Sequence, residues 1–196
     1  MRQRKATITR TTNETDISVT LNLDGTGQGN IQTGVQFLDH MLMLLAKHGV
    51  FDLDIVCKGD LGIDAHHSVE DIGICLGSVL DKVLGDKSGL IRFSHAYFPM
   101  DETLVRVVMD LSGRPYLIYN VKVARERVGE LEADLIEEFW KAFVTHSRVN
   151  MHIELLYGRN THHIFEAVFK ATARALNLAT RIDTRIQGVP STKGVL

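Results

Sequence analysis

A short motif that occurs twice, half a chain apart, constrains the fold of this sequence more than any other feature. His66-His67-Ser68-Val69-Glu70 recurs 96 residues later as His162-His163-Ile164-Phe165-Glu166 in a chain of 196 residues. Asp64 and Asn160 each stand two residues before the histidine pair. Self-similarity at a fixed spacing is typical of a repeated structural unit. We therefore predict a tandem duplication of one unit of roughly half the chain.

A second pair of segments extends this repeat. Phe37-Leu38-Asp39-His40-Met41 has a counterpart in Ile136-Glu137-Glu138-Phe139-Trp140, which aligns His40 with Glu138 at an offset of 98 residues. The two offsets differ by two residues, so we expect a small difference in loop length between the copies.

The hydrophobic pattern predicts the same elements in both halves. Alternating apolar and polar residues indicate strands, and apolar residues three and four apart indicate helices. In the first half, strands are predicted at 7–11, 16–23, 29–33 and 53–58, and helices at 35–47, with Gly49 as a stop, and at 66–84. In the second half, strands are predicted at 92–99, 103–111, 115–123 and 150–157, and helices at 131–147 and 161–178.

Each half therefore follows the order β-β-β-α-β-α, which predicts an α+β fold with sheets and helices in layers. We expect repeat halves at 1–90 and 91–180, followed by a polar, flexible tail at 181–196.

Composition excludes several classes of protein. The formal net charge of −2 argues against general nucleic-acid binding, because neutralising phosphates requires a basic surplus. No apolar run reaches the ~18 residues of a membrane span, so no membrane partner is expected. The basic residues 1–5 lead into polar sequence rather than into a secretory signal. Two cysteines, Cys57 and Cys75, make no disulfide framework, and we predict a cytoplasmic protein.

The repeated motif has the spacing of a metal site. Residues four apart on a helix share one face, so the first histidine and the glutamate of each motif can bind one ion. These pairs are His66 with Glu70 and His162 with Glu166. Imidazole and carboxylate ligands without thiolate suit Mn, Fe or Zn. A merely polar helix surface is the alternative, but the motif occurs twice in register, which favours the metal site.

The second histidine of each motif points about 100° away from the first and is expected to serve another ion or a neighbouring surface. Duplication allows an exchange, within one chain or between chains, in which His163 joins His66 and Glu70 while His67 joins His162 and Glu166. His40 and Glu138, which are equivalent in the repeat, would each add one ligand.

Basic residues offer a site for an anion. Arginine binds phosphate in a bidentate manner and lysine supplies a point charge. The candidates are Arg92, Arg114, Arg159, Lys170 and the segment Ser191-Thr192-Lys193. Each residue taken alone is equally compatible with a solvated surface position.

Five stretches of this sequence resemble the imidazoleglycerol-phosphate dehydratase family: 10–15, 37–42, 64–71, 158–167 and 190–196. The resemblance extends over nearly the whole chain. It implies a lyase of histidine biosynthesis that converts D-erythro-imidazole glycerol phosphate to imidazole acetol phosphate and water. It also implies two repeats similar to the second domain of ribosomal protein S5, and a large homo-oligomer, a 24-mer in the family, with active sites between subunits.

The resemblance further implies roles for individual residues. Two Mn²⁺ ions per active site are implied, one bound by His40, His67, His162 and Glu166, the other by His66, Glu70, His163 and Glu138. Many relatives carry histidine at the position of Glu138. Glu14 and His48 are implied as catalytic, with Glu14 moving the proton. The residues implied to contact the substrate or its phosphate are Glu14, His40, Arg92, Arg114, Lys170, Ser191, Thr192 and Lys193, so the C-terminal tail contributes to the site.

Two other classes of function remain open from the residues alone. A metal-dependent hydrolase would attack its substrate with metal-bound water and would turn over simple phosphoesters. A non-catalytic metal-binding or assembly protein would keep the histidine–glutamate pairs but would not need Glu14 or the basic residues.

Overall fold

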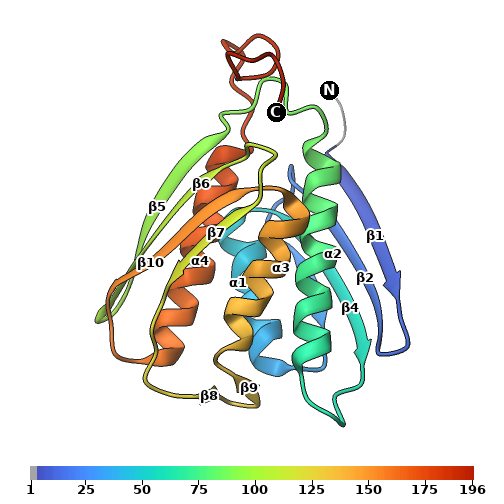
Figure 1. Ribbon diagram of the computed structural model, residues 1–196, viewed down its shortest axis with the longest axis vertical. Helices are drawn as coiled ribbons and strands as arrows, with labels where there is room; N and C mark the ends of the chain where they lie inside the picture. Colours follow the sequence, from blue (N-terminus) through green and yellow to red (C-terminus); the bar gives the residue numbers. More distant parts are fainter. Residues whose placement is uncertain (1–3) are drawn as a thin grey trace.

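Two units of the same topology make up the computed structural model, which describes residues 4–196 (Figure 1). Residues 1–3 lie outside the described residues. They belong to the N-terminal segment that, by its sequence, is not expected to be a secretory signal. The first unit consists of β1 (Lys5–Thr11), β2 (Thr15–Asn22), β3 (Gly29–Gln32), α1 (Gln36–Gly49), β4 (Asp52–Gly59) and α2 (His66–Leu84). The second consists of β5 (Phe93–Met100), β6 (Thr103–Asp110), β7 (Tyr116–Asn120), β8 (Arg127–Val128), β9 (Leu131–Glu132), α3 (Leu135–Ser147), β10 (Asn150–Tyr157) and α4 (Thr161–Ala179).

Each unit contains one four-stranded sheet, and the two sheets have equivalent strand orders, β1-β2-β4-β3 and β5-β6-β10-β7. In each sheet one edge strand, β3 or β7, runs parallel to its neighbour, whereas the other pairs are antiparallel. The predicted α+β fold of two β-β-β-α-β-α repeats is therefore confirmed.

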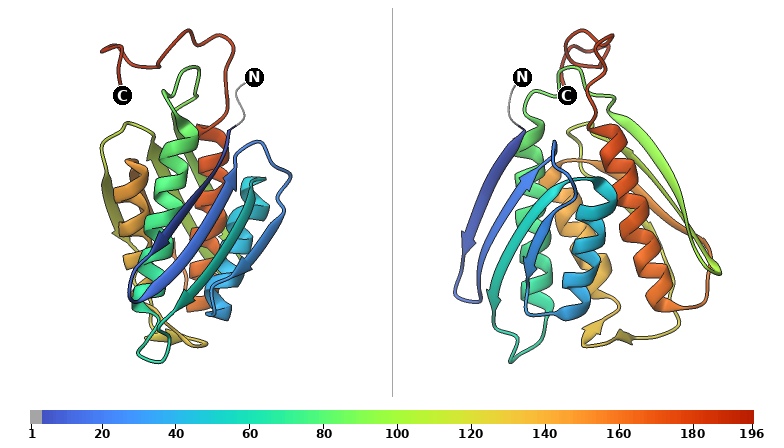
Figure 2. Two further views of the ribbon diagram at one scale, coloured as in Figure 1. Left: turned by 90° about the vertical axis from the view of Figure 1, so that its right-hand side faces the viewer. Right: turned by 180° about the vertical axis from the view of Figure 1, so that it is seen from behind.

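The four helices form the interior, with one sheet on either side (Figures 1 and 2). Helix α2 packs on β1 and β2, and α4 packs on β5 and β6. The units meet through two helix pairs, α1 with α4 and α2 with α3. Alternation on the strands places the apolar side chains inward, as in β2, where Ile17, Val19 and Leu21 are buried.

All four helices begin at the same end of the molecule, the lower end in Figure 1. The β1–β2 and β5–β6 turns lie at this end, and the C-terminal tail lies at the opposite end (Figure 1). The start of each histidine motif, at the first turn of α2 or α4, is therefore brought to one end of the fold.

Several predicted boundaries were wrong, most of them by one or two residues. Helix α3 begins at Leu135 rather than at 131, because Gly129 adopts φ +61° and residues 127–132 form the β8–β9 hairpin. Strand β7 ends at Asn120, not 123. Gly49 is the last residue of α1, and Val50 takes the left-handed position that ends the helix.

Helices α2 and α3 approach closely because glycine lies between them. A Cβ atom added at Gly77 would stand 2.5 Å from the carbonyl oxygen of Phe143. We expect Gly77→Ala to lower the free energy of unfolding by about 1–3 kcal/mol, although alanine favours helix, because the backbone contact cannot yield. Urea unfolding measures this effect. Gly62→Ala, where the new Cβ meets open space, is the matched control, and equal losses in both variants would contradict the explanation.

Among residues 4–196, none of the helices combines the length and the apolar character that crossing a membrane requires.

Candidate active site

Two helices from different units bring three metal-binding side chains together. His40 lies on α1, and His162 and Glu166 lie on α4, with one ligand atom of each within 4.8 Å of the others. Glu166 Oε1 is 2.9 Å from His40 Nε2 and 3.1 Å from His162 Nε2. In the described part of the chain, this is the one group of three or more such residues at that spacing. The cluster contains three of the four ligands implied for the first ion.

The carboxylate of Glu166 is buried but ionised. Burial raises its pKa, but hydrogen bonds from Lys170, His40 and His162 outweigh this and bring the pKa to about 2. Lys170 Nζ lies 2.5 Å from Glu166 Oε2. Within one chain, Lys170 is thus the counter-ion of a candidate metal ligand, and its role at a phosphate remains a prediction.

The corresponding cluster in the other helix pair is less complete. His66 Nε2 lies 3.8 Å from Glu70 Oε2, with both side chains about half exposed. Glu138 occupies the position of His40, since α1 and α3 end in matching left-handed residues, Val50 and Arg148, 98 positions apart. Its carboxylate pairs with Lys141 at 2.8 Å.

The structure therefore does not gather the second implied ligand set, His66, Glu70, His163 and Glu138, within one chain. The exchange expected from the sequence, in which each motif lends its second histidine to the other, is likewise not formed among residues 4–196.

The second histidine of each motif instead contacts carboxylates. His67 Nδ1 is 2.9 Å from Asp60 Oδ2, and its Nε2 is 3.7 Å from Glu14 Oε1. The hydrogen bond to Asp60 raises the pKa of His67.

In the second unit, His163 Nδ1 is 2.8 Å from Glu102 Oε2, and its Nε2 is 3.9 Å from Asp101 Oδ2. Hydrogen bonds from His163 and from the backbone N–H of Asn160 hold the pKa of Glu102 well below its usual range. Sequence reasoning missed Asp60, Asp101 and Glu102. All three are acidic residues in loops at the end of the molecule where the helices begin, and this shared position is the signal that could have identified them.

The two residues implied as catalytic lie in different surroundings. Glu14 is half exposed in the β1–β2 turn beside His67. His48, in the last turn of α1, packs against Phe98 with ring centroids 5.6 Å apart. Burial and the positive charges of Lys170 and Arg174 lower the pKa of His48, which keeps it neutral at neutral pH. The structure does not bring Glu14 and His48 into contact.

The other implied phosphate contacts lie at the far end of the molecule. Arg92 precedes β5, Arg114 precedes β7, and the tail carries Ser191, Thr192 and Lys193, all at the end opposite the helix starts (Figure 1). A 19-residue helix such as α2 is about 28 Å long. A small phosphate ester cannot bridge that distance, so these residues do not share a site with the histidines of the same chain.

Arg92 is fully engaged at that end. Its Nε and Nη2 donate to the Asp110 carboxylate at 2.7 and 3.1 Å, and its Nη1 donates to the Pro190 carbonyl at 2.7 Å. A further hydrogen bond joins Gly89 N–H to the Gly188 carbonyl. The tail, predicted to be flexible, is thus attached to the second unit immediately before Ser191.

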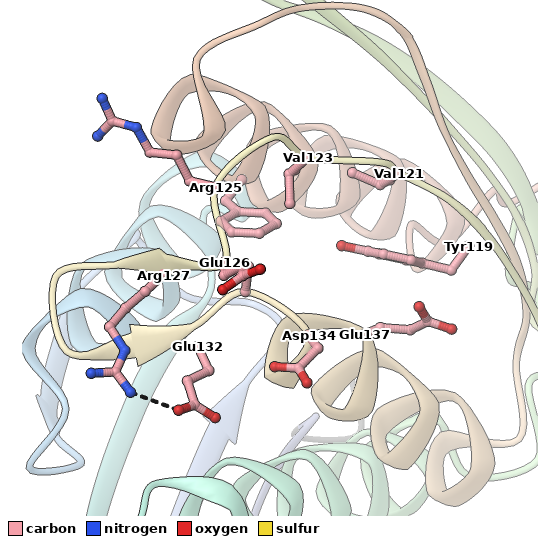
Figure 3. Close-up of a pocket in the computed structure, with 11 residues that line it drawn as sticks. Tyr119, Val121, Val123, Arg125, Glu126, Arg127, Glu132, Asp134 and Glu137 are labelled. Carbon is pink, nitrogen blue, oxygen red and sulfur yellow. Dashed lines mark hydrogen bonds and ion pairs between the residues drawn. The ribbon is translucent and has the colours of Figure 1, made fainter.

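A cavity of about 620 Å³ lies beside the β8–β9 hairpin (Figure 3). Its wall carries the carboxylates of Glu126, Asp134 and Glu137 and the Tyr119 hydroxyl, which is buried without a hydrogen-bond partner among residues 4–196. Burial raises the pKa of Tyr119. None of the sequence-predicted site residues lines this cavity.

Comparison with known proteins identifies close relatives. A model of the family described as imidazoleglycerol-phosphate dehydratase matches residues 33–176. The protein of that name from Acetivibrio thermocellus is 54% identical over 98% of this chain and 99% of its own length. The one from Chromobacterium violaceum is 56% identical over 98% of both chains.

Solved structures agree with these matches. The crystal structure of the enzyme of that name from Staphylococcus aureus superposes with a TM-score of 0.84 at 42% identity, covering 91% of this chain and 99% of that one. The structure from Pyrococcus furiosus, in complex with (S)-C348, gives a TM-score of 0.83 at 39% identity, covering 96% of this chain and 100% of that one.

Proposed function

Since the chain belongs to the imidazoleglycerol-phosphate dehydratase family, we propose that it dehydrates imidazole glycerol phosphate at a site with two Mn²⁺ ions that binds the substrate ring as imidazolate. Family membership makes the chain a lyase of histidine biosynthesis, which excludes the hydrolase and the non-catalytic alternatives. The observation that carries the metal proposal is the convergence of His40, His162 and Glu166 from two units.

The donor set fits manganese. Two imidazoles and an ionised carboxylate, with no thiolate nearby, are ligands that suit Mn²⁺. His40, His162 and Glu166 would hold one ion, with His67 as the fourth ligand. His66, Glu70, His163 and Glu138 would hold the other. In each set, ligands that do not converge within one chain would come from another copy.

When bound, the two ions would act as Lewis acids on the two ring nitrogens of the substrate and give the ring the imidazolate character that favours loss of the neighbouring hydroxyl. Glu14, which is half exposed and next to His67, moves the proton as general acid–base. His48, whose pKa is lowered by burial and by the positive charges of Lys170 and Arg174, would be the second catalytic residue. The net loss from the substrate is one hydroxyl and one proton, as water.

The phosphate would be bound by a different copy of the chain. The basic residues of the tail end lie about a helix length from the histidines, so a complete site requires the tail end of one copy to meet the helix-start end of another. The phosphate would contact Arg114, Ser191, Thr192 and Lys193. Arg92, which donates to the Pro190 carbonyl, would hold the tail in the position needed for this contact. Lys170 would face the same phosphate from the side of Glu166.

A surface suited to self-association supports this proposal. The outer face of the second sheet exposes Phe93, Tyr97, Val108 and Tyr116. The outer face of the first sheet carries mostly polar and charged side chains, such as Thr20 and Asp54, together with the exposed Val56. An exposed apolar face of this kind marks an interface. A homo-oligomer in the cytoplasm, where the free and buried Cys57 and Cys75 stay reduced, is part of the proposal.

The direct test is to strip metal from the full-length protein and to incubate it with imidazole glycerol phosphate, with and without Mn²⁺. We expect imidazole acetol phosphate to form only when Mn²⁺ is added. Formation at the same rate without added metal would contradict the metal proposal, and no product in either sample would contradict the activity.

A mixing experiment tests the shared site. Chains carrying Glu166→Gln and chains carrying Lys193→Ala are each expected to be nearly inactive. Unfolding and reassembling them together should recover about one quarter of wild-type activity, because random assembly pairs an intact metal end with an intact tail end once in four sites. Reassembling each variant alone is the control. A mixture no more active than its components would show that one chain supplies both sets of residues.

A further inference from the structure

The second histidine of each motif is oriented by a carboxylate on its Nδ1. These carboxylates are Asp60 for His67, at 2.9 Å, and Glu102 for His163, at 2.8 Å. An ionised carboxylate only accepts hydrogen bonds, so each Nδ1 carries the hydrogen, and in the neutral imidazole that binds a metal each Nε2 keeps its lone pair. Histidines that bind a metal through one nitrogen commonly donate the other N–H to a carboxylate, which fixes the tautomer and the ring orientation.

The two carboxylates come from positions that are not equivalent in the repeat. Thr15 and Thr103 begin β2 and β6 and are both buried, so Glu14 and Glu102, one residue earlier, hold the same turn position. In the second unit this turn glutamate orients the histidine. In the first unit Asp60 does so, from a β4–α2 connection of six residues, whereas the β10–α4 connection has three.

Asp60 is dedicated to this contact. His67 is its hydrogen-bond partner through Oδ2, and its Oδ1 is buried without a partner in the described chain. Burying part of a carboxylate costs stability unless the charge is well paired. Asp60 is therefore poorly explained by stability alone and is well explained by the orientation of His67.

We infer that Asp60 and Glu102 are the positioning residues of the two metal-directed histidines. In the first unit, Asp60 takes the role that Glu102, the repeat equivalent of Glu14, has in the second unit. This inference rests on the proposed function, because it concerns the metal ligands named there. Glu14 lies on the Nε2 side of His67, with its half-exposed carboxylate 3.7 Å from that nitrogen. The two equivalent glutamates therefore have different roles after duplication: Glu14 moves the proton, and Glu102 orients His163.

Glu102 also has a structural contact that the test must separate. Its Oε1 accepts the backbone N–H groups of Arg159 and Asn160 at 3.2 and 2.8 Å. Glutamine at this position keeps one acceptor oxygen but cannot serve both the loop and His163. Among the described residues, the Asp60 carboxylate accepts no backbone N–H, so Asp60→Asn reports on the histidine alone.

Manganese binding to the metal-stripped, full-length oligomer is the experiment, with free Mn²⁺ measured by electron paramagnetic resonance. Asp60→Asn and Glu102→Gln are each expected to bind one Mn²⁺ per chain as wild type does, and the second about 10–100-fold more weakly. The controls are Asp101→Asn, the exposed carboxylate on the Nε2 side of His163, and the exposed Glu130→Gln, for which both affinities should stay within about twofold of wild type.

The outcomes separate the two proposals. Wild-type protein that binds no Mn²⁺ would overturn the proposed metal site itself. Wild-type binding of two ions with unchanged binding in Asp60→Asn and Glu102→Gln would overturn only the positioning role. An equal loss in the controls would also overturn it, since any removed negative charge would then have the same effect. Should Glu102→Gln fail to fold by circular dichroism, Asp60→Asn decides the question.

Discussion

Replacing Glu166 by glutamine is expected to lower the turnover of imidazole glycerol phosphate at limiting Mn²⁺ by at least about 1,000-fold, because the metal supplies several kcal/mol of transition-state stabilisation. Glu166 is the one carboxylate shared by His40, His162 and Lys170. Glutamine has nearly the same shape but no charge, so it leaves Lys170 without its counter-ion and the cation site without its anionic ligand.

Turnover and bound manganese should be measured together across a range of Mn²⁺ concentrations. The exposed Glu130→Gln, in the β8–β9 turn, is the matched control and should behave as wild type. High Mn²⁺ is expected to restore part of the activity, because two imidazoles of the site remain. A Glu166→Gln enzyme with full metal content and full turnover would contradict the assignment.

Replacing Glu14 by glutamine is expected to lower kcat by about 10²–10⁴-fold, the usual contribution of a positioned general acid–base. KM and manganese content should change little, because the proton transfer belongs to the transition state and Glu14 is in no cluster of three candidate metal ligands among the described residues. Steady-state kinetics at saturating Mn²⁺ measure the effect.

The aspartate variant provides the comparison for Glu14. Glu14→Asp keeps the carboxylate but shortens its reach, and we expect a smaller loss of kcat than in Glu14→Gln. Normal turnover by Glu14→Gln would assign the proton transfer to another group, and His48, which is neutral beside Lys170 and Arg174, would be the next candidate.

Much of the fold could be predicted because its main signals are periodic and repeated. The bounds of α2 and the start of α4 follow from the histidine motifs, and β10 follows from an alternating run. The start of α3 could not be predicted in the same way. Leu131 is buried like a helix residue, but a glycine with positive φ at 129 places it in a hairpin strand instead.

The candidate site was predictable in its types of residue and less so in its arrangement. The i, i+4 spacing correctly pairs His162 with Glu166, and the repeat correctly aligns His40 with Glu138. Contacts made by loop residues leave no periodic trace, which is why Asp60, seven residues before His67, and Glu102, 61 residues before His163, escaped prediction. The separation of Arg114 and Lys193 from the histidines depends on the direction in which every helix runs, which the sequence does not encode locally.

The pairing of α1 with α4 and of α2 with α3 has the symmetry of a dimer contained in one polypeptide. The repeat equates α1 with α3 and α2 with α4, so both pairs are the same contact formed twice, as in an isologous interface. A half-length ancestor could have formed this contact with its own twin, but every substitution would then have appeared on both sides. Fusion removed that constraint, so one half can carry histidine at position 40 and the other glutamate at the equivalent position 138, and each half can evolve without its partner.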